Sequence, residues 1–204
     1  MADKSIYLAS RSPRRRELLR QIGVSFEIIP LREAPRYPAD VDETPRPGEA
    51  PDAYVLRVVL EKAQAAVSIT RARRLASRPV LAADTTVVRD EAILGKPENA
   101  AAAARMLESL AGRAHRVLTA IAVTTGDVIE TRVSESQVWF RALTSEEIRR
   151  YVATGEPTDK AGAYAVQGRA AAFITRIEGS YSGIMGLPLA ETAELLRGHG
   201  ISVP

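Results

Sequence analysis

Apolar positions along the chain recur with two different spacings, and the mixture predicts an α/β protein. Short apolar runs between turn-forming residues are typical of strands, and apolar residues three or four positions apart are typical of helices. The predicted strands are residues 6–9, 24–29, 79–88, 92–94, 115–125, 128–140 and 171–177. The predicted helices are residues 13–22, 52–71, 100–111, 145–154 and 188–198. Their alternation predicts a mixed central β-sheet flanked by helices.

Polar and turn-forming residues mark the ends of these elements. Ser12 is a helix N-cap with Pro13 at the first helical position, and Thr144 with Glu147 forms a capping box. Residues 126–127, Gly-Asp, predict a hairpin between the two longest strands. Three segments have the composition of loops, namely residues 31–51, 162–168 and 179–186.

Length and composition bound the class of protein. The 204 residues predict one domain spanning 1–204, with two lobes around a cleft. No apolar run reaches the roughly 20 residues of a membrane span, and residues 6–9 are too short for a signal-peptide core. The chain has no cysteine, which excludes disulfides, zinc–thiolate sites and thiol nucleophiles. We therefore expect a cytoplasmic protein with no membrane partner.

The distribution of charge argues against a nucleic-acid partner. The net charge is +3 and aromatic residues make up only 5% of the chain, whereas nucleic-acid binders usually concentrate more positive charge between aromatics. Only four of the 28 basic residues are lysines, and three of them, Lys62, Lys96 and Lys160, are internal. Because lysine is a compact point charge and arginine a planar fork, these three positions are candidates for sites that need an ammonium group. Chance is the alternative explanation.

The start of the first predicted helix is a candidate anion site. It directly follows a strand, and free backbone N–H groups and the helix dipole favour an anion there. Arg14 and Arg15 add guanidinium groups that match phosphate oxygens, and Ser10 and Ser12 add hydroxyl donors. The alternative is that Glu17 and solvent compensate the positive charge. We favour an anionic ligand, because several anion-binding features meet at one point.

Five further side chains stand where they could carry chemistry. Asp84 lies within an otherwise apolar strand pattern, where it could hold a divalent cation, act as a general base, or cap a local turn. Gln167, in a glycine-punctuated loop, could read the edge of a base or belong to a surface turn. Lys62 and Lys96 are compatible with phosphate binding and with ordinary surface positions. Glu43, in the proline-rich loop, is a further carboxylate or plain solvated charge.

The chain contains only two histidines, which narrows the chemistry. His115 lies in a strand pattern and His199 near the C-terminal end, so structural roles are favoured over a Ser-His-Asp triad or a histidine metal cluster. The remaining arginine, lysine and carboxylate chemistry suits hydrolysis of phosphate esters or anhydrides with Mg²⁺ or Mn²⁺. In such a reaction carboxylates hold the metal and activate water, while cations neutralise the phosphate charge.

Residues 8–19, LASRSPRRRELL, resemble the opening signature of the Maf family of nucleotide pyrophosphatases. The resemblance continues in order through VDE (41–43), LEKA (60–63), ADT (83–85), GKP (95–97), DKAGAY (159–164) and GLPL (186–189). It covers nearly the whole chain. Each segment alone is weakly specific, but seven in one order are specific.

The resemblance implies a fold and an activity. The implied fold is α/β with two lobes around a nucleotide cleft, as in the inosine triphosphatases. The implied reaction is hydrolysis of a nucleoside triphosphate to the monophosphate and pyrophosphate with a divalent metal, as house-cleaning of nucleotide pools. Residues 159–164 and 166–168 are similar to the branch that acts on dTTP and UTP, and modified pyrimidine nucleotides are further candidates. The alternative is a non-catalytic nucleotide-binding regulator of cell division.

The resemblance also implies roles for individual residues. Asp84 matches the residue taken as proton acceptor in that branch. The residues that match Arg14, Thr85 and Gln167 are tied to substrate choice there. The two lysines that match phosphate-side lysines of the family are Lys62 and Lys96.

Together, the residue chemistry and the resemblance give one working hypothesis. Four basic residues are expected to grip the triphosphate: Arg14, Arg15, Lys62 and Lys96. Asp84, with Glu43, is expected to hold Mg²⁺ or Mn²⁺ and to activate water for attack at the α-phosphorus. Thr85 and Gln167 are expected to sense the pyrimidine. We expect the helix start with its serines, Ser10 and Ser12, to face this group.

Three features depart from the family pattern. Residues 182–185, Ser-Gly-Ile-Met, stand where the family usually has an asparagine, Ala165 replaces a usual glycine, and residues 31–40 are longer than usual. Among protein partners, a second copy of the chain in a homodimer is one possibility.

Overall fold

One mixed sheet forms the centre of the molecule. The computed structural model describes residues 5–32 and 38–203. In these residues the strand order is β2-β1-β3-β5-β6-β7, with β4 paired to the far end of β3. The strands are β1 (Ser5–Ala9), β2 (Ser25–Ile28), β3 (Val80–Arg89), β4 (Ala92–Leu94), β5 (Ala114–Thr124), β6 (Ile129–Phe140) and β7 (Ile174–Glu178). β1 is parallel to β2 and β3, and the other pairings are antiparallel.

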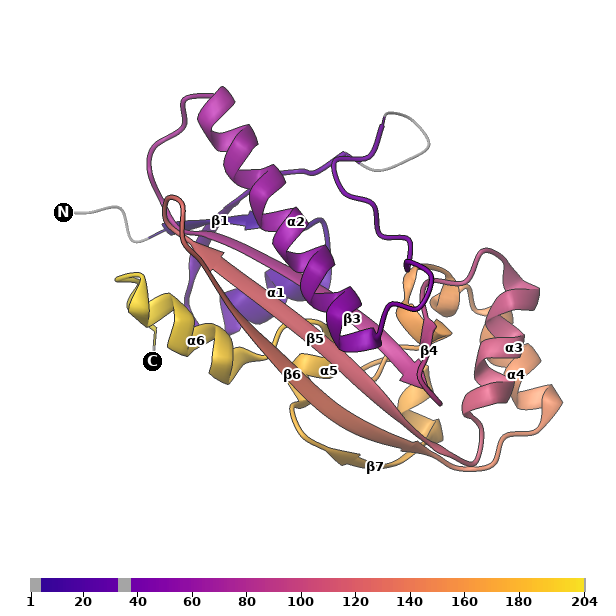
Figure 1. The fold of residues 1–204 in the computed structure, drawn as a ribbon. Coiled ribbons are helices and arrows are strands. Elements are labelled where there is room, and N and C mark those ends of the chain that lie inside the picture. Colours follow the sequence, from indigo (N-terminus) through magenta and orange to yellow (C-terminus); the bar gives the residue numbers. More distant parts are fainter. Residues whose placement is uncertain (1–4, 33–37, 204) are drawn as a thin grey trace.

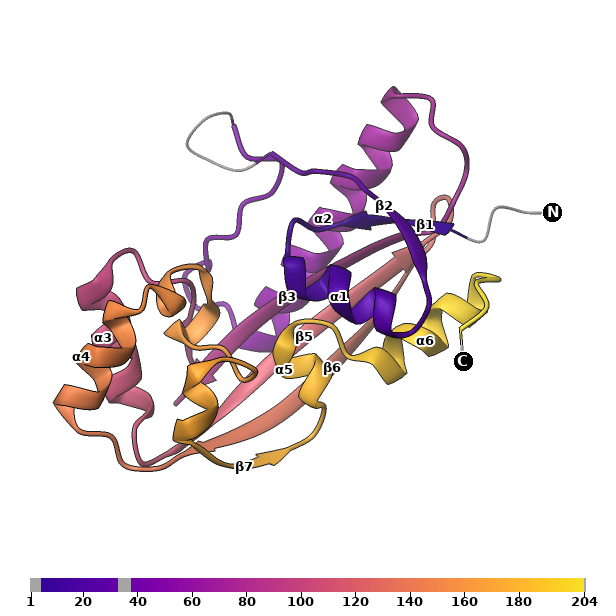
Figure 2. The same cartoon turned by 180° about the vertical axis from the view of Figure 1, so that it is seen from behind.

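Helices cover both faces of this sheet. The helices are α1 (Pro13–Gln21), α2 (Pro51–Ala72), α3 (Ala100–Leu110), α4 (Ser145–Ala153), α5 (Tyr181–Met185) and α6 (Leu189–Gly198). In Figure 1 the long helix α2 lies across the front of β3 and β5, and in Figure 2 α1, α5 and α6 lie on the opposite face. α3 and α4 lie side by side at the far end of the long β5–β6 hairpin in both views.

The alternation of side chains along β3 divides the interior into separate cores. Val80, Ala82 and Val88 pack beneath α2, whereas Leu81 and Ala83 pack toward α1 and α6. This follows from the period of two in a strand, whose successive side chains point to opposite faces. A third core lies among α3, α4 and the adjoining 3₁₀ turns. The first two cores make one lobe and the third makes the other, as the sequence predicts.

Two predictions of local structure are wrong. Residues 171–177 were expected to be a strand, but Arg169–Phe173 is a 3₁₀ helix and the strand is Ile174–Glu178. Ala170 and Phe173 are buried three positions apart, which is a helical spacing that the alanine-rich run hides. Residues 179–186 were expected to be a loop, yet they contain α5, whose N-cap Ser180 accepts a hydrogen bond from Gly183 N–H. This cap lets a five-residue helix form despite its glycine.

The remaining elements match the predicted ones to within a few residues. Within residues 31–51, the part 33–37 lies outside the described residues, so the length difference expected at 31–40 is described only in part. Across 5–32 and 38–203, no helix is both long enough and apolar enough to cross a bilayer.

Candidate active site

A gap in the strand pairing of β3 creates a cleft. β1 pairs with β3 only as far as Ala82, β4 pairs with it only from Val87 onward, and β5 follows the whole opposite edge. Figure 1 shows β1 and β4 near opposite ends of β3. Within the described sheet, residues 83–86 therefore have one edge without a neighbouring strand. A cleft of about 960 Å³ opens there, which is the size of many small-molecule sites.

Both faces of β3 contribute side chains to this cleft. Asp84 has the same parity as Ala82 and Val88, so it lies on the α2 face of the sheet. Thr85 has the same parity as Ala83 and lies on the α1 face. Both residues line the cleft. The open edge lets neighbouring residues on opposite faces reach the same space.

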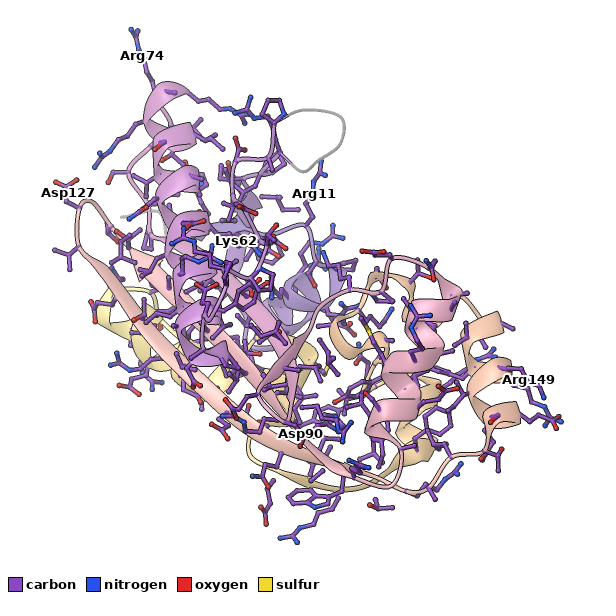
Figure 3. All side chains as sticks on the ribbon, turned by 45° about the vertical axis from the view of Figure 1, so that its right-hand side comes forward. Arg11, Lys62, Arg74, Asp90, Asp127 and Arg149 are labelled. Atoms are coloured by element: carbon purple, nitrogen blue, oxygen red, sulfur yellow. The ribbon has the colours of Figure 1, made fainter. Side chains whose placement is uncertain are left out.

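Lys62 of α2 joins two carboxylates at the cleft. Its Nζ lies 2.7 Å from Asp84 Oδ1 and 2.7 Å from Glu43 Oε1. The side chain of Asp84 is only 9% exposed, whereas that of Glu43 is 42% exposed. Figure 3 shows Lys62 in the middle of the molecule, while Arg74 and Arg149 extend outward at its ends. The ammonium group therefore offsets two negative charges at the boundary between core and cleft.

The loop that carries Glu43 is held in place by hydrogen bonds to its backbone carbonyl groups. Arg57 donates hydrogen bonds to the carbonyl oxygens of Asp42 at 2.9 Å and Thr44 at 3.0 Å. The hydroxyl of Tyr54 donates to the carbonyl oxygen of Glu43 at 2.9 Å. Both donors come from α2, the helix that also carries the cleft lysine. Helix α2 thus holds the loop and places its carboxylate in the cleft.

The two carboxylates fit a divalent cation that also binds phosphate oxygens. Burial raises the pKa of Glu43, but the charge and hydrogen bond of Lys62, followed by the charges of Lys96 and Arg15, outweigh burial and lower the pKa overall. Mg²⁺ usually takes one or two carboxylates together with water and substrate phosphates, and Asp84 and Glu43 supply such a pair. Among the described residues, no three acidic or histidine side chains are grouped to hold a metal by themselves.

Arg15, in the first turn of α1, is held by three protein groups. Its Nε donates to the carbonyl oxygen of Gly186 at 2.7 Å, Nη1 to Ser10 Oγ at 3.2 Å, and Nη2 to Thr85 Oγ1 at 3.2 Å. Burial lowers the pKa of Arg15, and the charge of Asp84 opposes that shift. Arg15 therefore connects three segments of the cleft wall, and its role as a phosphate ligand stays a prediction.

The start of α1 has the geometry of an anion site. Ser12 is the N-cap, and its hydroxyl accepts from Arg15 N–H at 3.5 Å, while Ser12 N–H donates to Ser10 Oγ at 3.2 Å. The first turn contains no acidic residue. Glu17 lies in the second turn and is exposed. The free end of the helix dipole therefore faces the cleft with basic side chains around it.

Arg14 approaches the second lobe across the cleft. Its Nη1 lies 3.9 Å from Asp159 Oδ2, whose side chain is 66% exposed, so the pair contributes little to stability. Lys160 donates to the carbonyl oxygen of Glu156 at 2.7 Å and is only 14% exposed. Unlike the other two internal lysines, Lys160 thus supports the backbone of its own loop.

Lys96 and Gln167 lie on the wall formed by the second lobe. Gly162 N–H donates to the carbonyl oxygen of Gly95 at 3.1 Å, which ties the turn before Lys96 to the 3₁₀ turn Ala161–Ala163. Lys96 and Gln167 are exposed, and neither makes a hydrogen bond or ion pair with another residue of the described chain. Both side chains are available to a ligand.

Every candidate site residue from the sequence lines this one cleft. They are Ser10, Ser12, Arg14, Arg15, Glu43, Lys62, Asp84, Thr85, Lys96 and Gln167. Their chemical roles stay predictions. The sequence reasoning missed Tyr54 and Arg57, which hold the Glu43 loop, and Thr119, which contacts Thr85. The pattern offered one signal for Thr119, a hydroxyl within an otherwise apolar strand.

The structure also gives the positions, relative to the cleft, of the two histidines and of the residues that depart from the family pattern. His115 and His199 are both absent from the described cleft lining. His115 Nε2 lies 2.8 Å from the hydroxyl of Tyr164, and burial lowers the pKa of His115 to about 4. Residues 184–186, at the end of α5, line the cleft, and so does Ala165.

Comparison with known proteins adds an independent line of evidence. The family model described as Maf-like protein matches residues 5–199. A protein of Aromatoleum aromaticum named dTTP/UTP pyrophosphatase is 58% identical over 96% of this chain and 95% of its own. Proteins with the same name from Nitrosomonas europaea and Burkholderia pseudomallei are 54% and 59% identical, over 99% and 94% of this chain and 98% and 92% of their own. These matches show that this chain belongs to the Maf family.

Proposed function

We propose that this chain hydrolyses dTTP and UTP to the monophosphate and pyrophosphate. The observation that carries the proposal is the pairing of Asp84 with Lys62 in a cleft that is also lined by the start of α1, which has no acidic residue in its first turn. Three full-length relatives at 54–59% identity are named for this activity. Those names favour the enzyme over a non-catalytic regulator of cell division. Modified pyrimidine nucleotides are further candidate substrates.

The proposed chemistry is attack by water at the α-phosphorus. The water oxygen forms a bond to Pα, the bond from Pα to the bridging oxygen of Pβ breaks, and pyrophosphate leaves with the electron pair. Asp84 accepts the proton of the attacking water through its carboxylate. Lys62, at 2.7 Å from Oδ1, holds that carboxylate in one orientation. A divalent cation bound by Asp84 and Glu43 would withdraw charge from the phosphate oxygens.

Cationic groups on both lobes would bind the triphosphate. Lys96 on the second lobe and Arg14 on α1 have side chains that reach the cleft without strong protein partners. The N–H of Arg14 at the start of α1 and the hydroxyls of Ser10 and Ser12 would add neutral donors. Arg15 would contribute positive potential while keeping its protein contacts. Such preorganised charge stabilises the transition state more than it would in water.

Gln167 is proposed to read the pyrimidine. Its amide offers both a donor and an acceptor, which uracil and thymine can match on one edge. It is exposed on the cleft wall. Thr85 is proposed to contribute to the same choice.

The test is turnover of a panel of triphosphates by the purified full-length chain. dTTP, UTP, dCTP, dGTP and ATP are incubated with Mn²⁺ or Mg²⁺, and products are separated by chromatography. We expect monophosphate and pyrophosphate in equal amounts from dTTP and UTP. Asp84→Asn should reduce turnover by about 100-fold or more, as is typical when a general base is lost. Near wild-type turnover by Asp84→Asn would refute the assignment, and binding without any monophosphate would favour the regulator.

Several wider expectations remain proposals. We propose that the enzyme works in the cytoplasm and removes unwanted nucleotides from the pool. We also propose that the protein assembles as a homodimer and has no nucleic-acid partner.

A further inference from the structure

Thr119 lies at the centre of a hydrogen-bond chain behind the cleft wall. It is in the middle of β5, opposite Thr85 in the strand register, and is fully buried. Its Oγ1 donates to the carbonyl oxygen of Gly183 at 2.8 Å and lies 2.9 Å from Thr85 Oγ1. Thr85 Oγ1 in turn lies 3.2 Å from Arg15 Nη2. This series of hydrogen bonds thus runs from α5 through β5 and β3 to α1.

The direction of each hydrogen bond follows from which groups carry a proton to donate. A carbonyl oxygen can only accept, so the single hydroxyl proton of Thr119 points at Gly183. The contact with Thr85 must then use the proton of Thr85. The guanidinium of Arg15 can only donate, so it uses one lone pair of Thr85 Oγ1. The second lone pair of Thr85 Oγ1 is therefore free to accept a hydrogen bond from the cleft, whereas its hydroxyl proton is already used.

We propose that Thr119 is a positioning residue that makes Thr85 an obligate hydrogen-bond acceptor toward the substrate. This inference rests on the proposed function. Ionised phosphate oxygens only accept, so Thr85 cannot donate to them, and its substrate partner must be a donor on the nucleoside. The N3–H of thymine or uracil and the sugar 3′-hydroxyl are such donors. Cytosine has an acceptor at N3 and is disfavoured at this position.

The first test compares Thr119→Val with Thr119→Ser in the full-length chain. Valine keeps the shape but removes both hydrogen bonds, so the proton of Thr85 becomes free to point into the cleft. Serine keeps both bonds. We measure kcat and KM for dTTP, for dCTP, which lacks N3–H, and for 2′,3′-dideoxy-TTP, which lacks the 3′-hydroxyl.

We expect wild type and Thr119→Ser to prefer dTTP over at least one analogue by tenfold or more in kcat/KM. In Thr119→Val that preference falls about tenfold, and the analogue affected identifies the donor. A purely structural role would lower all three kcat/KM values in proportion. An unchanged ratio in Thr119→Val, or a wild type without either preference, overturns the proposal.

Two further measurements keep the outcome decisive. If Thr119→Val does not fold, Thr119→Ala removes the same two bonds with less bulk and carries the same expectation. If wild type turns over no triphosphate, the proposed activity fails, but the Thr119 inference is still tested by calorimetric binding of the same three nucleotides. A binding preference that Thr119→Ala leaves intact then overturns it.

Discussion

Replacing Lys62 by methionine should lower stability and create a response to divalent cations. Methionine keeps most of the apolar stem but removes the charge that lies 2.7 Å from both Asp84 and Glu43. The two carboxylates then lose their direct ion pair, and only the charges of Arg15 and Lys96 remain nearby to oppose their repulsion. Because one of the carboxylates is buried, a poorly compensated charge results, which is destabilising.

The size of the effect follows from the exposure of each partner. An ammonium and a carboxylate about 4 Å apart attract by about 4 kcal/mol at an effective dielectric constant of about 20, which suits Asp84. The side chain of Glu43 is 42% exposed, so screening reduces its attraction to Lys62 to at most about 1 kcal/mol. Removing the ammonium also relieves its own desolvation, which leaves a net loss of about 3 kcal/mol. At about 2–4 °C per kcal/mol for a chain of this size, Tm should fall by roughly 6–12 °C.

The assay is thermal unfolding of both proteins with and without Mn²⁺. A cation held between the two carboxylates at about 100 times its Kd returns about 2.7 kcal/mol, so Mn²⁺ should restore most of the lost Tm in Lys62→Met. Wild type should respond less without nucleotide, since its ammonium group already neutralises part of the carboxylate charge that would attract the cation. Lys160→Met is the matched control, because Lys160 is equally buried but contacts only one carboxylate, Asp159.

Two results would refute the reasoning. One is a Lys62→Met variant whose Tm falls but does not respond to Mn²⁺ more than wild type does. The other is an equal Mn²⁺ response in Lys160→Met, which would place the binding elsewhere. Loss of the response in Lys62→Met/Glu43→Gln would assign the cation to this pair of carboxylates.

Three further predictions concern the surroundings of the cleft. The pKa of His115 is lowered to about 4 by burial, so the unfolded state binds more protons below pH 6.5, and the free energy of unfolding should fall by about 2 kcal/mol from pH 7 to pH 5. Urea titrations should show less of this slope in His115→Phe. A Cβ at Gly162, where φ is +66°, would lie 2.8 Å from Val87 Cγ2. Gly162→Ala should therefore lower the free energy of unfolding, measured by calorimetry, by at least about 2 kcal/mol. Adding Val87→Ala should restore part of this loss. A Gly162→Ala variant with the stability of wild type would contradict the packing argument. Arg57→Met should free residues 42–44, raising KM more than it lowers kcat and speeding proteolysis there, whereas Arg71→Met on the same helix should do neither.

The cleft residues could be predicted from sequence because their chemistry is concentrated in short segments. Ser12 with Pro13 marks a helix start by local rules alone, and the geometry has Ser12 as the N-cap. Lys62 and Lys96 were singled out by the scarcity of lysine, and both line the cleft. Lys160 was singled out equally and also lines the cleft, but its ammonium group bonds to the Glu156 carbonyl and to Asp159 of its own loop. Composition therefore identifies candidates, while the partner of each charge depends on the fold.

Other features could not be predicted because they depend on contacts between distant segments. The bond from Thr119 to Gly183 spans 64 positions, and the bond from Arg15 to Gly186 spans 171. The one local signal at Thr119 is a hydroxyl within an apolar run, and the same signal is given by a hydroxyl that a strand merely tolerates. The shift of the last strand has another cause. An alanine-rich run such as Arg169–Phe173 supports both helical and extended readings, and burial of Phe173 decides between them.

The strand period of two gives Asp84 and Thr85 different partners, and the open edge of β3 lets both reach the same cleft. Asp84 and Thr85 are neighbours in sequence, yet one meets Lys62 from α2 and the other meets Arg15 from α1. Covering the edge with a strand would confine them to opposite faces of the sheet. Because the period of a strand is two, inserting one residue before Asp84 would exchange their faces and place a carboxylate against the hydroxyl of Thr119. Register here is therefore a condition of the proposed mechanism: such an insertion should abolish turnover even in a chain that still folds.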